Sequence, residues 1–161
     1  MKKVMILTLS LFVALFSVSC IDSSSAEDAL AKGIQGEWHL SSWSGEMSEQ
    51  IDIYVEFKAD NTFNLYQKDW NTPIYYVHYT GTYLIADGVI TGKYSDGKNW
   101  GATNGYNVSL SKDNGQLTLI DVDNSDDISL FVPVTIPENV KGGAAVMTTR
   151  GDEMFNIERF L

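Results

Sequence analysis

The chain has 161 residues, enough for one domain with a sizeable buried core. It carries 11 basic and 21 acidic residues, which gives a formal net charge of −10 at pH 7. Nucleic acids and anionic lipid surfaces bind clustered Lys and Arg, so this composition excludes both as expected partners.

Residues 1–19 have the layout of a secretory signal peptide. Lys2 and Lys3 precede an apolar run over 4–16, and small residues follow at 17–19. The apolar run is too short to span a bilayer stably. Removal of residues 1–19 takes away two lysines and no acidic residue, which changes the net charge from −10 to −12.

Cys20 is the single cysteine and follows directly after this signal, so no disulfide can form within the chain. Its position resembles the lipobox of bacterial lipoproteins, in which the cysteine is acylated and becomes the first residue of the mature chain. The alternative is a free cysteine near an ordinary cleavage site. We expect lipidation at Cys20, a location at the bacterial outer membrane facing the periplasm or the cell surface, and a flexible tether over 20–33.

From residue 35 onward, apolar residues recur with a period of two, which is typical of half-buried antiparallel strands. Short turn signals separate the runs, at Asp60-Asn61, Asp87-Gly88 and Lys112 to Gly115. The pattern predicts strands over 35–44, 51–57, 63–67, 74–85, 89–94, 106–110, 117–119 and 128–132.

The hairpin at Asp87-Gly88 indicates the register of its two strands. If Ala86 pairs with Val89, the apolar residues share one face and the polar residues share the other. The predicted inward face carries Tyr75, Val77, Tyr79, Tyr83, Ile85, Ile90 and Tyr94, and the outward face carries His78, Thr80, Thr82, Thr91 and Lys93.

Eight strands in simple succession, each with one apolar face, favour closure into a barrel, because closure leaves no exposed sheet edge. We therefore predict an all-β fold, an eight-stranded up-and-down antiparallel barrel in the domain 34–161. Its C-terminal extension, 137–161, includes a short helix that begins near Pro137 and ends at Gly142-Gly143. Weak alternation over 154–160 could add a ninth strand.

Three motifs resemble a known family. Gly36-Glu37-Trp38 is similar to the Gly-x-Trp signature of lipocalins, and the stretches 57–63 and 81–92 resemble the lipocalin-like lipoproteins of Bacteroidetes. The likeness covers about residues 34 to 140. It implies a lipocalin-like barrel whose base is closed by Trp38, with an Arg packed across it. Arg159 is favoured over Arg150 for that role, and ordinary core packing is the alternative for Trp38.

If Trp38 marks the closed end, the longer connections lie at the open end, over 44–50, 68–73, 95–104 and 123–127. Large aromatic residues fall on or near them, and their flat faces and polar edges suit a small apolar or amphipathic ligand. The predicted ligand-binding residues are Trp43, Trp70, Tyr75, Tyr94, Trp100 and Tyr106.

Two other interpretations of these aromatics remain open. They could simply cap the core, since Tyr and Trp favour strands. They could also hold an envelope protein, because Tyr and Trp dominate interface hot spots. The chain would then be a protein-interaction or inhibitor module whose barrel is filled by Tyr79, Tyr83 and Tyr94.

The sequence carries none of the common catalytic signatures. It has no Gly-x-Ser-x-Gly, His-Glu-x-x-His, phosphate loop or Gly-x-Gly-x-x-Gly. His39 and His78 fall on the predicted outer face, away from each other. The run 121–127 resembles the opening of a calcium loop but lacks its Gly and its final Glu. We expect no enzymatic activity, no cofactor and no metal site.

Overall fold

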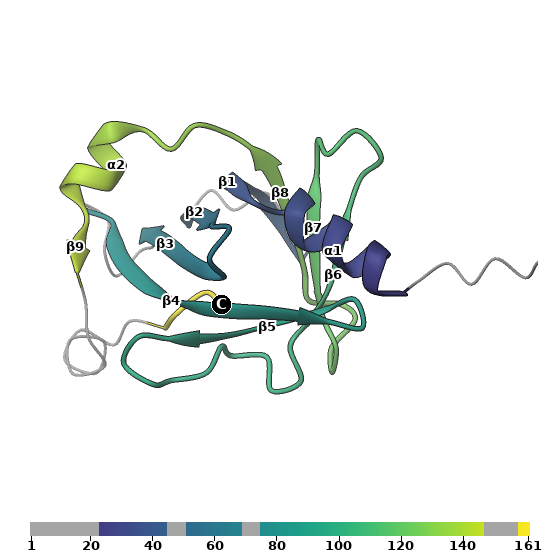
Figure 1. Cartoon of the computed structure of the whole chain (residues 1–161). Coiled ribbons are helices and arrows are strands. Elements are labelled where there is room, and N and C mark those ends of the chain that lie inside the picture. Colours follow the sequence, from purple (N-terminus) through teal and green to yellow (C-terminus); the bar gives the residue numbers. More distant parts are fainter. Residues whose placement is uncertain (1–22, 45–50, 69–74, 147–157) are drawn as a thin grey trace, which may run out of the picture.

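The computed structural model describes residues 23–44, 51–68, 75–146 and 158–161. Each strand pairs antiparallel with the next, and the eighth pairs back with the first, so the sheet closes into a barrel (Figure 1). The eight strands are β1 (Gly36–Trp43), β2 (Asp52–Phe57), β3 (Thr62–Lys68), β4 (Val77–Ala86), β5 (Val89–Tyr94), β6 (Tyr106–Leu110), β7 (Leu117–Asp121) and β8 (Ile128–Pro133). The predicted eight-stranded up-and-down barrel is confirmed.

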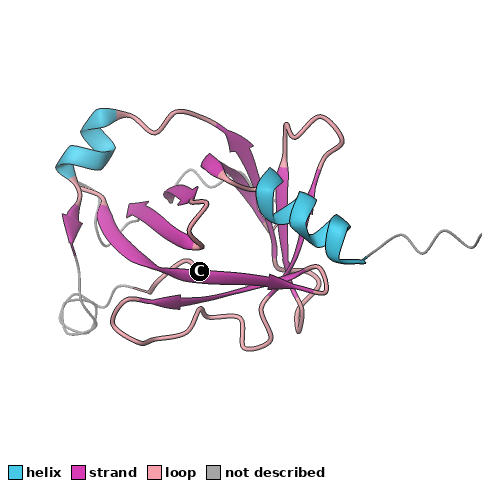
Figure 2. Cartoon of the chain, viewed as in Figure 1, coloured by secondary structure: helices cyan, strands magenta, loops and turns pink. Residues whose placement is uncertain are grey.

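Helices flank the barrel at opposite ends in the described part of the chain (Figure 2). They are α1 (Ser23–Gly33) and α2 (Glu138–Gly143), and a short strand, β9 (Ala145–Val146), follows α2. In the view of Figure 1, α1 lies to the right of the barrel, and α2 and β9 lie to the left. Neither helix has the length and apolar composition needed to cross a membrane.

The hairpin turns follow the predicted turn chemistry. Ala86 pairs with Val89, and Asp87 and Gly88 between them have φ angles of 53° and 75°. Positive φ at both central residues is the geometry of the tight hairpin that Asp-Gly favours. Asn61 and Asn114, in the other two short hairpins, also have positive φ, at 62° and 54°.

The barrel interior is filled by alternate residues of each strand. On β2, Ile53, Val55 and Phe57 are no more than 1% exposed, and the residues between them face outward. Burial of one such side chain contributes roughly 1.5–3 kcal/mol. The predicted inward face of β4 and β5 is confirmed for the buried residues Val77, Tyr79, Tyr83, Ile90 and Tyr94.

The prediction of a flexible tether is wrong for residues 23–33, which form α1. Ala and Leu, both strong helix formers, recur through this segment. Leu30 packs against the barrel core, next to the fully buried Ile34. The helix also approaches the barrel closely at Gly33, where an added Cβ would lie 2.6 Å from the Leu110 side chain. Tertiary packing of one apolar side therefore stabilises a segment whose polar composition suggested a linker.

The segment after β8 crosses the outside of the barrel. Ile136 and Val140 pack with the buried Tyr66 of β3 in a second, smaller apolar cluster. Glu37 of β1 anchors this crossing, since its carboxylate accepts hydrogen bonds from the Ile136 N–H and from Lys141 Nζ, at 2.7 and 2.6 Å. The short helix predicted near Pro137 is present as α2, with Pro137 at its N-cap.

The ninth strand lies elsewhere than predicted. β9 pairs parallel with β4 at Val77 and His78. Because β5 pairs only with residues 81–86 of β4, the first residues of β4 have a free edge on that side, and β9 takes it. Residues 158–160 of the predicted strand over 154–160 are not in a strand, and 154–157 lie outside the described residues.

Candidate functional site

The barrel has two ends of different character. The short hairpins after β2, β4 and β6 lie at one end, the base, and the longer described connections after β5 and β7 lie at the other end, the mouth, together with the last residues of β1 and β3. The tail segment, residues 158–161, lies inside the mouth. Leu161 is 2% exposed and belongs to the main core cluster. The mouth is therefore occupied by the protein's own chain.

Gln67 of β3 holds the main chain of the tail segment. Its side-chain amide donates to the carbonyl of Glu158 at 2.6 Å, and its side-chain oxygen accepts the N–H of Phe160 at 2.9 Å. Gln67 is only 3% exposed, so both bonds form in a largely water-free place. On β5, the Tyr94 hydroxyl donates to the carbonyl of Leu161 at 2.5 Å. All three bonds are made to main-chain atoms of the tail segment and none to its side chains.

Arg159 and Phe160 place their side chains in two different surroundings. The Arg159 guanidinium lies over the rings of Tyr79 and Tyr94, 4.7 and 4.4 Å from their centroids. It also forms a double hydrogen bond to the Asp96 carboxylate, at 3.1 and 2.5 Å. Phe160 meets apolar rings instead, with centroid distances of 5.7 Å to Trp43 and 6.4 Å to Phe131.

The buried tyrosines of the mouth are neutral near neutral pH. Burial raises the pKa of the Tyr94 phenol, and this outweighs the opposing charge of Arg159. Burial, with the nearby charges of Asp127 and Asp121, raises the pKa of Tyr106 to about 12. Neither phenol ionises near neutral pH, so neither can serve as a general base there.

The predicted ring of six aromatic ligand-binding residues is not formed as expected. Tyr94, Trp100 and Tyr106 are 3–7% exposed and belong to the core. Trp43 and Tyr75 are 40% and 37% exposed, so Tyr75 does not face inward as predicted. Trp70 lies outside the described residues. Only part of the predicted set therefore meets at the mouth.

Trp100 is buried because its loop folds back along β5. The main-chain N–H of Trp100 donates to the Gly92 carbonyl at 3.0 Å, and Lys93 and Asn99 form an isolated antiparallel β-bridge. An added Cβ on Gly92 would lie 2.0 Å from the indole, so glycine makes room for the ring. The ring packs against Phe63 at 5.3 Å. Its indole N–H is buried and has no hydrogen-bond partner among the described residues.

Comparison with known families agrees with this architecture. A family model described as a lipocalin-like domain matches residues 34–119, which run from the start of the barrel into β7. The chain belongs to the lipocalin-like family. No curated protein matches it. The lipocalin-like barrel is a ligand-binding type of fold, and such barrels generally bind small hydrophobic molecules. Both α1 and the tail segment lie outside the matched residues.

The Gly-x-Trp residues lie at the base of this lipocalin-like barrel. Gly36 has a φ of 138°, which residues with a side chain rarely adopt. Trp38 is 3% exposed, and its indole N–H donates to the carbonyl of Ile34 at 2.7 Å. The ring thus closes the base next to α1.

The predicted packing of Arg159 across Trp38 is wrong. Its guanidinium is held at the mouth by Asp96 and by two tyrosine rings, at the end of the lipocalin-like barrel away from Trp38. Arg150 lies outside the described residues. The Asp96 carboxylate and the faces of two tyrosine rings together hold Arg159 at the mouth.

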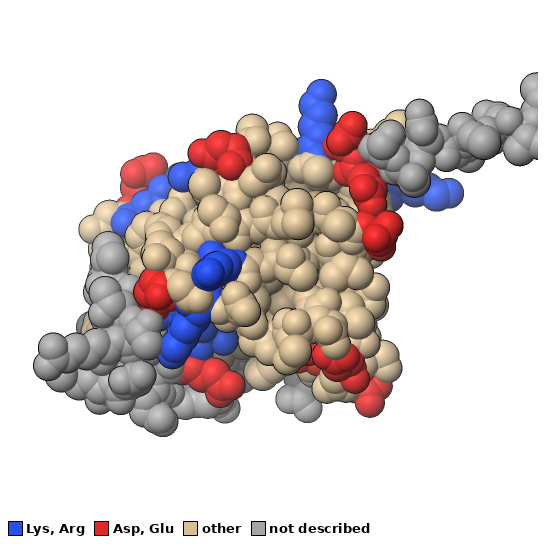
Figure 3. All heavy atoms as spheres, turned by 60° about the horizontal axis from the view of Figure 1, so that its bottom comes forward, with Lys and Arg blue, Asp and Glu red and all other residues tan. Residues whose placement is uncertain are grey.

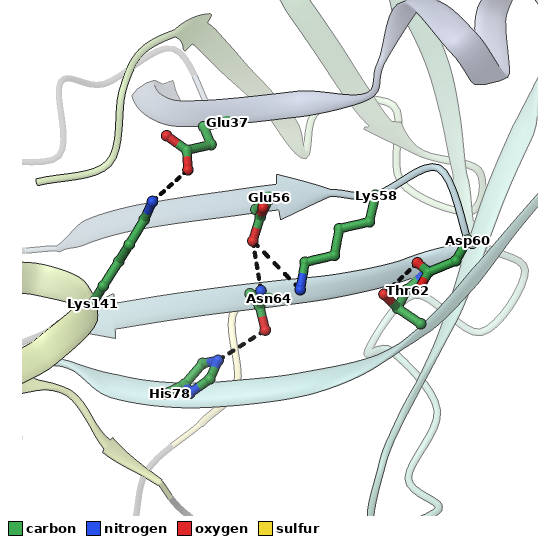
Figure 4. Close-up of polar contacts among 8 residues, drawn as sticks. All are labelled: Glu37, Glu56, Lys58, Asp60, Thr62, Asn64, His78 and Lys141. Atoms are coloured by element: carbon green, nitrogen blue, oxygen red, sulfur yellow. Dashed lines mark hydrogen bonds and ion pairs between the residues drawn. The ribbon is translucent and has the colours of Figure 1, made fainter. Parts of the chain in front are cut away.

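Both histidines lie on the outer face, as predicted. His78 Nε2 donates a hydrogen bond to the side-chain oxygen of Asn64 at 3.0 Å, and the Asn64 amide nitrogen donates to Glu56 at 2.6 Å (Figure 4). His39 contacts Asp52 at 2.7 Å, and it stacks on Tyr54 with a centroid distance of 4.3 Å. Among the described residues, no group of three or more His, Cys, Asp or Glu side chains could hold a metal ion.

Sequence reasoning missed Gln67, Asp96 and the tail segment as parts of the mouth. A signal existed for Gln67: it continues the inward alternation of Phe63 and Leu65 but is polar. A polar residue on an apolar face requires a buried partner. The partner is more than 90 residues away along the chain, and no local pattern identifies it.

Proposed function

We propose that this protein is a bacterial envelope lipoprotein of the Bacteroidetes type, whose lipocalin-like barrel binds a small apolar or amphipathic molecule at its mouth. One observation carries the proposal: the tail segment is held in the mouth as a ligand would be. Buried polar groups of Gln67 and Tyr94 bind its main chain, and aromatic rings contact its apolar side chain. A few convergent polar groups in an apolar cavity are typical of ligand sites.

The proposal places the molecule at the membrane through a lipid on Cys20 alone, after removal of the signal peptide 1–19. On the face shown in Figure 3, acidic side chains lie mostly around the edge, and basic side chains are spread over several separate places among them. Such a face is unsuited to adsorb on anionic lipid. Labelling of cells with a fatty-acid analogue should modify the wild-type chain and leave a Cys20→Ser variant unlabelled.

We propose binding rather than catalysis as the activity. The two histidines, His39 and His78, lie on the outer face of the barrel and not inside it. The titratable groups that contact the tail segment include the neutral phenol of Tyr94 and the Asp96 carboxylate, which is paired with Arg159. These groups suit recognition of polar atoms more than acid–base chemistry at neutral pH.

Native mass spectrometry of the mature domain, recovered from its own envelope without detergent, tests the proposal. We expect a stoichiometric small-molecule adduct that is reduced in the variants Gln67→Leu and Tyr94→Phe. Both substitutions keep the volume of the side chain and remove its hydrogen bonds. Leu84→Ala, on a side chain that is 63% exposed, serves as the control. A bare mass from wild type would contradict the proposal.

A second candidate is a protein-interaction or inhibitor module with a filled barrel. The burial of Tyr79, Tyr83 and Tyr94 inside the barrel favours it. The half-exposed rings of Trp43 and Tyr75 would then face an envelope protein. Crosslinking in intact cells should give one protein adduct that is lost in a Trp43→Ala, Tyr75→Ala double variant.

A further inference from the structure

The surroundings of Arg159 form a site for a positive charge, assembled from three elements. Tyr79 of β4 and Tyr94 of β5 present ring faces, and Asp96 in the following loop presents both carboxylate oxygens. The Arg159 and Asp96 side chains are only 8% and 21% exposed. Ring faces attract cations, and a carboxylate forms its strongest hydrogen bonds with a guanidinium in this two-pronged geometry.

Gln67 adds selectivity for a peptide. Its carboxamide donates to one main-chain carbonyl and accepts from the N–H two residues later, at Glu158 and Phe160. This is the pair of bonds that a neighbouring strand would supply. A lipid or a sterol offers no such spaced carbonyl and N–H, whereas any extended peptide does.

A third part of the mouth accepts an apolar side chain directly after the cation. Phe160 packs edge-on to Trp43 and Phe131, and Leu161 is buried beyond it with its carbonyl bound by Tyr94. The order is thus fixed: a basic residue at the acidic and aromatic site, followed by apolar residues deeper in the barrel.

We infer that the mouth is a recognition site for an extended peptide with a basic residue followed by an apolar one, and that the tail segment occupies this site as an internal ligand. The inference rests on the proposed function, because it names the class of amphipathic molecule that the mouth takes. The net charge of −10 also favours a cationic ligand over an anionic one.

An internal ligand competes with any external one. The tail segment is covalently attached, so its effective concentration at the mouth is high, and a free peptide binds only in the fraction of molecules whose mouth is open. A change that weakens the tail segment should therefore strengthen the binding of a free peptide. A change in the barrel residues that contact the peptide should weaken the binding of a free peptide. These opposite signs distinguish a binding site from simple core packing.

The test is isothermal titration calorimetry of the full mature chain with the blocked peptide acetyl-Glu-Arg-Phe-Leu-amide. We expect Arg159→Gln to bind this peptide about tenfold more tightly than wild type, because the internal competitor has lost its charge. Adding Asp96→Asn to Arg159→Gln should reverse the gain by about tenfold. Adding Glu138→Gln, on an exposed residue of α2, should leave the gain unchanged and controls for net charge.

A second peptide with Gln in place of Arg checks the same contact from the ligand side. It should bind Arg159→Gln about tenfold more weakly than the Arg peptide does. Equal affinity of the two peptides, or no binding to any folded variant, would overturn the inference. If native mass spectrometry then still shows a neutral lipid adduct, the proposed function stands alone. If no adduct is present either, both fail.

Discussion

The two ends of the barrel are closed by different means, and β1 carries a tryptophan toward each. At the base, Trp38 is buried and bonds to Ile34, four residues earlier in the sequence. At the mouth, Trp43 is 40% exposed and contacts Phe160, which is distant along the chain. The hydrogen bond of Trp38 at the base is thus local in sequence, whereas the hydrogen bonds and the ion pair that hold the tail segment at the mouth join residues distant in sequence. We therefore expect the base to serve as a structural end of the barrel and the mouth as the end that opens.

Replacement of the two tryptophans should give the largest contrast. We expect Trp38→Ala to lower the free energy of unfolding by about 3–5 kcal/mol, because it leaves a cavity in the core and removes the bond to Ile34. Trp43→Ala should cost about 1 kcal/mol or less. Urea denaturation followed by circular dichroism measures both. Equal losses would show that the two ends are equally part of the folding core.

Gly92→Ala should show how much the packing of the loop over 95–105 contributes to the free energy of unfolding. The new methyl group would collide with Trp100, so we expect a loss of about 1–3 kcal/mol and a change in tryptophan fluorescence. Gly101→Ala, in the same loop, is the matched control, since an added Cβ there meets no atom within 4 Å. A silent Gly92→Ala variant would mean that Trp100 readily leaves its place.

Arg159→Gln should loosen the mouth while the base stays closed. The substitution removes the ion pair to Asp96 and the contacts with two tyrosine rings, worth about 1 kcal/mol for a partly exposed pair. We expect faster hydrogen exchange at the Phe160 amide and unchanged exchange at the amides of β2. Uniform acceleration in both places would indicate global destabilisation and would contradict a mouth that opens by itself.

The smallest expected effect concerns acid sensitivity on the outer face. Burial lowers the pKa of His78 from its usual 6.5, and the charge of Lys58 acts in the same direction. The unfolded chain therefore takes up a proton that the folded chain resists. The stability contributed by neutral His78 is present above about pH 6.5 and is lost as the pH falls through the folded-state pKa.

Denaturation at several pH values between 8 and 5 would show this dependence. We expect wild type to lose stability over this range more steeply than a His78→Gln variant. Glu37 also loses stabilising contacts on acidification, since its bonds to Lys141 and Ile136 outweigh the effect of burial and lower its pKa. That loss lies below pH 4.5, outside the range, so it does not obscure His78. Parallel curves for the two proteins would refute the role of His78.

The sequence predicted the barrel because a barrel of hairpins is built from local signals. Alternation identified the strands, and Asp87-Gly88 fixed a register that the structure confirms. The base was predictable because Gly36-Glu37-Trp38 resembles the lipocalin signature, and that motif is a local feature of the sequence. Apolar alternation and turn chemistry each involve only a few consecutive residues, so both are visible in the sequence alone.

The mouth was less predictable because its contacts join distant residues. Asp96 and Arg159 are 63 positions apart, and either could have been an ordinary surface charge. Among the aromatic residues predicted for the mouth, Trp100 lies in the core because its loop folds back over Gly92. Helix α1 was missed because its polar composition concealed one docking residue, Leu30.

Helix α1 also bears on the orientation of the protein relative to a membrane. If Cys20 carries a lipid, as we propose, only residues 21 and 22 separate it from the start of the helix. Two or three residues span about 10 Å at most. Near its middle the helix bonds to the hairpin at Asp87, at the base. So short a connection would hold the base close to the bilayer and orient the mouth away from it. Ligands would then reach the mouth from the aqueous side and not from the lipid.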